Sequence, residues 1–152
     1  MAVECTEDEL LEIVENILAL DTAMRFAAIL DLNGKILEGI MNESKTSLES
    51  QKQQEKFCKD AAKARKMREK YNGTLGKVRY IHNERENVTQ IISYAPNCTI
   101  FVTMEPELRI NKKLQIITKI KKMTTTIAKK QQTLFLKQLL NIYFEIFIGG
   151  TP

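Results

Sequence analysis

The stretch RFAAILDLNGKILEGI, residues 25–40, decides the fold. Asn33-Gly34 at its centre is typical of a tight type I′ turn, which joins two antiparallel strands. The first arm is apolar on both faces, and such a strand is covered on both faces. The stretch therefore predicts a hairpin inside a sheet that has helices on each side. Alternate residues of a strand point in opposite directions, here Phe26, Ala28, Leu30 and Leu32 to one face and Ala27 and Ile29 to the other.

The remaining elements follow from helix caps and β-branched runs. A capping box at 6–9 precedes apolar residues at helical spacing, which predicts a first helix to about residue 20. A second capping box, Thr46 to Glu49, predicts a helix that runs to about Tyr71. Three strands and a long last helix complete the chain, over residues 76–83, 88–95 and 99–106 and from Leu108 onward.

This order of elements predicts an α+β fold. We expect a five-stranded antiparallel sheet with the first strand in its interior. The first and last helices should cover one face and the second helix the other. The run Met123 to Thr126 is a weak helix former, and a break is expected there. We therefore predict a domain of residues 1–123 and an amphipathic C-terminal helical extension of residues 124–152.

The hairpin, the stretch LGKVRYIHNE (75–84) and the stretch TIFVTMEPE (99–107) together resemble the roadblock/longin-like (profilin-like) group of small proteins. More closely, they resemble small uncharacterised proteins of this type in ammonia-oxidising archaea. The resemblance covers about residues 8–122. It implies a homodimeric scaffold or regulatory module, with a small GTPase or another signalling protein as partner, and it brings no catalytic residues.

The residues themselves do not favour an enzyme. The single histidine, His82, lies in the charged stretch HNERE, and the three cysteines, Cys5, Cys58 and Cys98, form no CxxC pair. No glycine-rich phosphate-binding motif occurs. We expect no catalytic residue, no cofactor and no metal. The acidic start is unlike a secretory signal, so a cytoplasmic location is expected.

The net charge of +4 hides a division along the chain. Residues 1–50 hold eleven acids and three bases, whereas residues 109–130 hold eight bases and no acid. The second helix is also basic and could lie along phosphates, so weak, salt-sensitive nucleic-acid binding is an alternative function. A solvated helix face would look the same. The expected basic surface consists of Lys52, Lys56, Lys59, Lys63 and Arg65.

Self-association is the favoured interaction. The second helix combines small residues with charges, as a helix packed closely against another element would. The strand from Lys77 to His82 has one obvious neighbour in the sequence, so its other edge can pair with a second copy about a two-fold axis. The expected dimer interface consists of Phe57, Ala61, Ala64, Val78 and Tyr80.

The C-terminal segment LFLKQLLNIYFEIFI, residues 134–148, is apolar in eleven of fifteen positions. Leaving even four large side chains in water would forgo several kcal/mol, at about 1.5–3 kcal/mol each. A helix of this length spans about 22 Å, less than the roughly 30 Å of a bilayer core. We expect burial against protein, within or between subunits, with peripheral membrane binding as the alternative. The expected contacts are Leu134, Leu139, Tyr143, Phe144 and Phe147.

Overall fold

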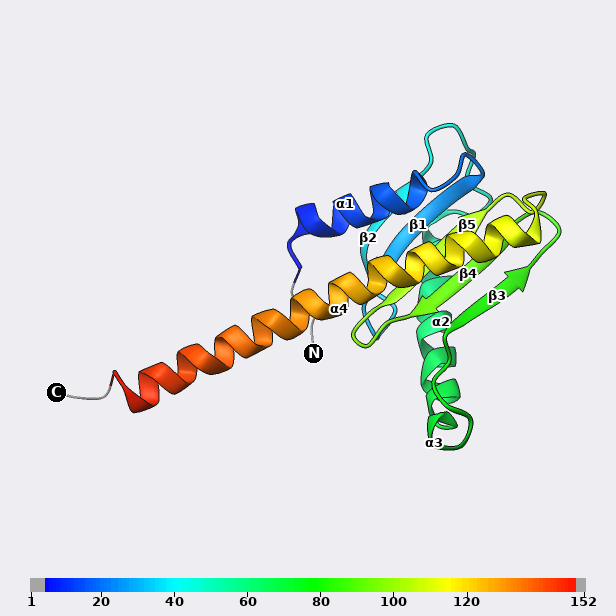
Figure 1. The fold of residues 1–152 in the computed structure, drawn as a ribbon. Helices are drawn as coiled ribbons and strands as arrows, with labels where there is room; N and C mark the ends of the chain where they lie inside the picture. The colour runs from blue at the N-terminus through cyan, green and yellow to red at the C-terminus, as the bar shows by residue number, and fades with distance from the viewer. Residues whose placement is uncertain (1–4, 150–152) are drawn as a thin grey trace.

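The structure is a computed structural model that describes residues 5–149, without the side chains of 126–132 and 134. Along these residues, the helices and strands follow each other in the order that the sequence predicts, with α3 as an additional helical turn (Figure 1). The four helices are α1 (Glu7–Leu18), α2 (Gln51–Glu69), the single turn α3 (Asn72–Leu75) and α4 (Ile110–Phe147). The five strands are β1 (Met24–Leu30), β2 (Ile36–Met41), β3 (Tyr80–Glu84), β4 (Thr89–Tyr94) and β5 (Thr99–Met104).

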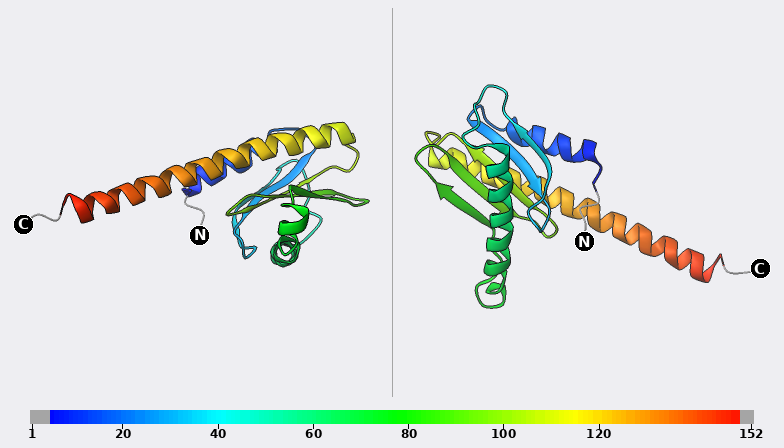
Figure 2. Two further views of the ribbon diagram at one scale, coloured as in Figure 1. Left: turned by 60° about the horizontal axis from the view of Figure 1, so that its bottom comes forward. Right: turned by 180° about the vertical axis from the view of Figure 1, so that it is seen from behind.

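The five strands form one antiparallel sheet in the order β2-β1-β5-β4-β3. Helices α1 and α4 lie on one face of this sheet, and α2 lies on the other (Figure 2). Strand β1 is in the interior of the sheet, and all seven of its residues are buried. The predicted fold class and the two-sided covering of the first strand are confirmed.

Two separate cores hold the layers together. On the α1/α4 face, Val14 and Ile17 of α1 and Ile120 of α4 meet the strand residues Ile29 and Val102. All five are fully buried. On the other face, α2 packs against the sheet through a second cluster. That cluster consists of Phe26, Ala28, Leu30, Cys58, Ala61, Ile92 and Phe101.

A buried arginine also joins α2 to the sheet. Arg65 Nη1 donates to the carbonyl oxygen of Cys98 at 2.8 Å and to Thr99 Oγ1 at 3.0 Å, and Nη2 donates to the carbonyl of Ala95. These acceptors belong to the β4–β5 connection and the start of β5. Arg65 is only 7% exposed, so its charge is satisfied by these carbonyls and by Glu69.

The hairpin turn differs from the type I′ turn predicted for Asn33-Gly34. Among the described residues only glycines have positive φ, so Asn33 cannot adopt the type I′ conformation. The Asp31 carboxylate instead accepts hydrogen bonds from the backbone N–H groups of Asn33 and Lys35, each at 2.9 Å. Gly34 alone in this turn is left-handed, at φ 85°. This is the pattern of a three-residue loop that ends in a left-handed glycine.

Helix α2 begins later than predicted. The expected box at Thr46–Glu49 is wrong, because the helix is capped by Ser50, whose hydroxyl accepts from the Gln53 backbone N–H at 3.2 Å. The Gln53 side chain accepts in return from the Ser50 N–H at 2.8 Å. Ser50 and Gln53 therefore form the capping box of α2, four residues after the predicted one. Gln53 takes the role that was predicted for Glu49.

Helix α4 has no break in the run from Met123 to Thr126, so that expectation is wrong. The hydroxyls of Thr124 and Thr125 donate to the carbonyls of Ile120 and Lys121, at 2.8 and 3.0 Å. The helix thus accommodates both threonines, with each hydroxyl bonded to a carbonyl one turn earlier. One 38-residue helix therefore runs across the expected boundary at 123/124, and the division into two units stays a prediction.

Three glycine-to-alanine substitutions separate backbone strain from steric fit. At Gly34, an added Cβ would lie 2.5 Å from the Cys58 carbonyl oxygen and the φ is positive, so Gly34→Ala should destabilise by roughly 2–3 kcal/mol or more. At Gly76 the backbone has φ 80° and ψ 168° in open space, a conformation that essentially only glycine adopts, so strain alone should cost about 1–3 kcal/mol. Gly73→Ala, with neither feature, should stay within about 0.5 kcal/mol. Denaturant unfolding measures all three, and an unchanged Gly34→Ala would contradict the close packing of α2.

Candidate interaction surfaces

The distal part of α4 projects away from the sheet (Figure 1). Its large apolar side chains are 46–70% exposed between Phe135 and Ile148. Of the contacts expected for this segment, Leu139, Tyr143, Phe144 and Phe147 are among these exposed residues, and the side chain of Leu134 lies outside the described part. The Tyr143 ring packs on Phe147 of its own helix, with ring centroids 4.8 Å apart. Burial within the same chain is therefore wrong for these four residues.

A second exposed apolar cluster lies at the end of α2 and in α3. It consists of Met67, Tyr71 and Leu75, which are 64%, 62% and 79% exposed. In Figure 1 this end of α2 and α3 extend beyond the sheet, below the start of β3. The sequence prediction missed the cluster, although its four-residue spacing was a signal that could have shown it.

The five residues expected at a dimer interface do not share one surface. Phe57 and Ala61 pack into the core between α2 and the sheet. Tyr80 packs against the core on the opposite face, that of α1 and α4. Ala64 and Val78 are half-buried. Strand β3 itself is at the edge of the sheet and pairs only with β4, as the open-edge prediction requires.

The basic surface of α2 contains four of the five expected residues. Lys52, Lys56, Lys59 and Lys63 are exposed and recur at helical spacing. Arg65 is not part of this surface, because its guanidinium is buried against the β4–β5 connection. The basic residues of α4 lie on the other side of the sheet from α2 (Figure 2). The two basic segments thus form no single surface along which one nucleic acid could lie.

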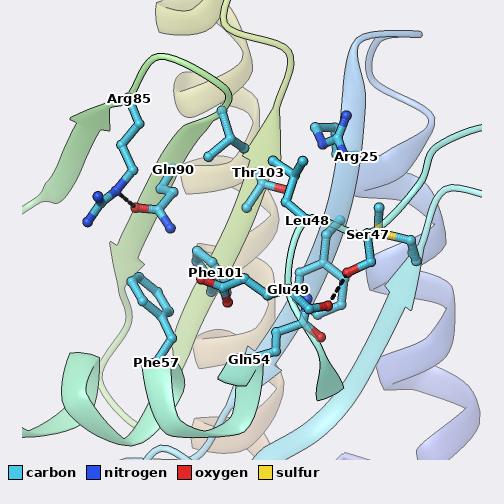
Figure 3. Close-up of a pocket in the computed structure, with 13 residues that line it drawn as sticks. Arg25, Ser47, Leu48, Glu49, Gln54, Phe57, Arg85, Gln90, Phe101 and Thr103 are labelled. Atoms are coloured by element: carbon cyan, nitrogen blue, oxygen red, sulfur yellow. Dashed lines mark hydrogen bonds between the residues drawn. The ribbon is translucent and has the colours of Figure 1, made fainter. Parts of the chain in front are cut away.

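A shallow cavity of about 180 Å³ lies beside the N-terminal half of α2, on the same face of the sheet (Figure 3). Phe57 and Phe101 line it, with ring centroids 4.7 Å apart. Its polar groups are largely paired within the chain. Arg85 Nε donates to Gln90 Oε1 at 3.0 Å, and Arg25 is bonded to Glu105 at 2.9 Å. The cavity is therefore a recess with aromatic side chains and a polar rim, whose two arginines are bonded within the chain.

The thiols and the histidine do not form a nucleophilic site. Burial, followed by the nearby charges of Glu49 and Glu55, raises the pKa of Cys58 to about 12. Burial likewise raises the pKa of Cys98 to about 11, against the opposing effect of Arg65. Both thiols are therefore protonated near neutral pH. Within residues 5–149, no group of three or more His, Cys, Asp or Glu side chains could hold a metal ion.

A network around Glu84 anchors the proximal half of α4 to the edge strand β3. The Lys113 ammonium, with a side chain only 4% exposed, lies 2.9 Å from Glu84 Oε2. The hydroxyl of Thr89 and Nε2 of His82 also contact this carboxylate. Partial burial alone would raise the pKa of Glu84, but the hydrogen bonds from Thr89, Lys113 and His82 outweigh it and lower the pKa to about 2. His82 is thus part of a structural ion network.

The architecture is a roadblock-like fold. The gliding protein MglB of Thermus thermophilus has a similar structure, with a TM-score of 0.69 at 11% identity over 86% of this chain and 96% of that chain. An MglB in a tetrameric arrangement gives 0.64 at 12% identity, over 84% and 96%. A Roadblock/LC7 domain of Streptomyces avermitilis gives 0.62 at 9% identity, over 80% and 96%. At these identities the likeness shows the fold alone.

The chain belongs to the family of unknown function DUF6659, whose model matches residues 7–131. No curated protein matches it in sequence. The apolar segment 134–148 lies beyond the matched residues. No helix in the part of the chain that the structure describes is both long and apolar enough to cross a membrane.

The Glu84 network makes stability depend on pH. Because the folded-state pKa of Glu84 lies below its unfolded value of about 4.3, its contribution is complete above that value and is lost as pH falls toward 2. Glu84→Gln should destabilise by about 1–2 kcal/mol at pH 7, since the carboxylate is partly exposed to solvent. The difference from the wild type should shrink between pH 5 and pH 2 in denaturant unfolding. The exposed Glu86→Gln is the control, and an equal effect of both would contradict the network.

Proposed function

We propose that this chain is a non-enzymatic, homodimeric scaffold that binds a regulatory partner protein. The observation that carries the proposal is the position of the Met67–Tyr71–Leu75 cluster near an open sheet edge. Large apolar side chains that are exposed together on a surface are typical of protein interaction sites. The roadblock-like fold supports the proposal, because the roadblock resemblance implies a homodimer without catalytic residues.

The dimer would be built by pairing the β3 strands of two copies. Strand β3 has hydrogen-bonded neighbours on one side only, so an antiparallel β3 from a second copy would satisfy its free backbone groups. A two-fold axis beside β3 would also place the two α2 helices antiparallel on one face of the joined sheet. Ala64, Met67, Tyr71 and Leu75 would then be removed from water, with Val78 beside them.

A small GTPase or another signalling protein is the partner that the roadblock resemblance implies. Support from the fold is by analogy, and the structures similar to this chain are named for gliding proteins and Roadblock/LC7 domains. The shallow cavity beside Phe57 offers a recess that a partner's side chain could enter. The dimer would leave this recess accessible, because it lies beside the opposite, N-terminal half of α2.

The double substitution Met67→Glu/Leu75→Glu tests the dimer. Four like charges across the two-fold axis should prevent association, so light scattering at micromolar concentration should give a dimer mass for the wild type and a monomer mass for the variant. Both side chains are exposed in the single chain, so the melting temperature of the isolated domain should change little.

Lys63→Glu, an exposed change on the same helix, is the matched control and should remain a dimer. A monomeric wild type, or a variant that stays dimeric, would contradict the proposed interface.

A further inference from the structure

We propose that the distal end of α4, residues 135–147, binds the surface of anionic phospholipid membranes as an interfacial helix. The inference depends on residues 119–148 alone and holds whether or not the domain dimerises.

Residues 135–147 of α4, called the distal helix, are apolar over more than half of the helix circumference. Its polar residues are Lys137, Gln138, Asn141 and Glu145, which at 100° per residue fall within an arc of about 100°. The opposite arc carries Leu139, Ile142, Tyr143, Ile146 and Phe147, all between 46% and 70% exposed. A helix with so narrow a polar stripe needs a contacting surface that removes most of its circumference from water along its whole length.

The same chain, a second copy and a membrane are the three surfaces that could bury this arc, and the exposure and width of the arc distinguish them. The same chain does not cover it, because these side chains are exposed. One helix from a second copy would cover only a seam of about two residues in seven and leave the rest of the arc in water. The acyl boundary of a membrane covers the whole arc at once. The distal helix also extends past the end of α1, so the acidic first turn of α1 does not lie over it (Figure 1).

Two basic residues lie along one border of the apolar arc. Positions eighteen residues apart in a helix are separated by five full turns and point in one direction. Lys119 is therefore aligned with Lys137, and Lys122 is aligned with Leu140 at one border of the apolar arc. Lys119 and Lys122 are exposed, and residues 109–130 contain no acid. A surface that receives the apolar arc thus also meets these ammonium groups, which favours anionic lipid.

The chain contains no tryptophan, so Tyr143→Trp introduces a single fluorescent reporter into the apolar arc. With full-length protein, vesicles of mixed phosphatidylserine and phosphatidylcholine should shift its emission to the blue as the indole leaves water. Gln51→Trp, at the exposed start of α2, is the control reporter and should not shift.

Two variants separate the apolar from the charged contribution in vesicle sedimentation. Phe144→Ser/Phe147→Ser should lower partitioning more than about tenfold without changing the melting temperature, because both rings are exposed in the free protein. Lys119→Gln/Lys122→Gln should lower binding to phosphatidylserine vesicles by about tenfold and leave binding to pure phosphatidylcholine unchanged. Asn141→Ser, in the polar stripe, is the matched control and should bind as the wild type does.

Two results would overturn the proposal. The first is wild-type protein that stays in the supernatant with phosphatidylserine vesicles at low salt. The second is a Phe144→Ser/Phe147→Ser variant that binds vesicles like the wild type. If the wild type ignores vesicles and light scattering shows that this variant has a smaller mass, the apolar arc is covered by a second copy. Loss of the β3-mediated dimer, by contrast, would leave every vesicle result unchanged.

Discussion

The burial of β1 on both faces is the constraint on which the rest of the structure depends. All seven residues of this strand are buried, so the sheet needs one layer of helices above it and another below it. Ala27 and Ile29 face α1 and α4, while Phe26, Ala28 and Leu30 face α2. Helix α2 can approach closely because Gly34 in the hairpin turn has no side chain where the Cys58 carbonyl lies. The hairpin therefore specifies the sheet and also the depth at which α2 packs.

The layered fold could be predicted from the sequence because it rests on patterns that are local. The run of residues 26–30, which is apolar on both faces, and the helical spacing in the flanking segments are visible without tertiary contacts. Details that depend on contacts between distant residues were not predicted. Arg65 looked like one more exposed base of α2, and only the carbonyls of Ala95 and Cys98, some thirty residues away, account for its burial. The turn at Asn33 was also predicted wrongly, although its cause is local. It follows from the Asp31 carboxylate rather than from the Asn-Gly pair alone.

The interaction surfaces were predicted less well than the fold, for a physical reason. Helical spacing shows which residues share a face, but it does not show which face the sheet covers. Phe57 and Ala61 were assigned to a dimer interface and are instead used by the chain's own core. The exposed residues Met67, Tyr71 and Leu75 lie at the end of α2 and in the turn and α3 that follow it, and their four-residue spacing does not indicate that the sheet leaves them uncovered. The break expected in α4 rested on the low helix propensity of the threonine run. The helix nevertheless continues, and the hydroxyls of Thr124 and Thr125 bond to carbonyls of the preceding turn.

The central claim is that the domain is complete without the distal half of α4, which is kept free for an external surface. Ending the chain after Thr133 and measuring denaturant unfolding tests this most directly. The account predicts an unchanged free energy of unfolding and an unchanged denaturant dependence, because the removed side chains that the structure describes are exposed in the folded chain. A loss of several kcal/mol would contradict it, since that is the effect expected if these apolar side chains were buried against their own domain.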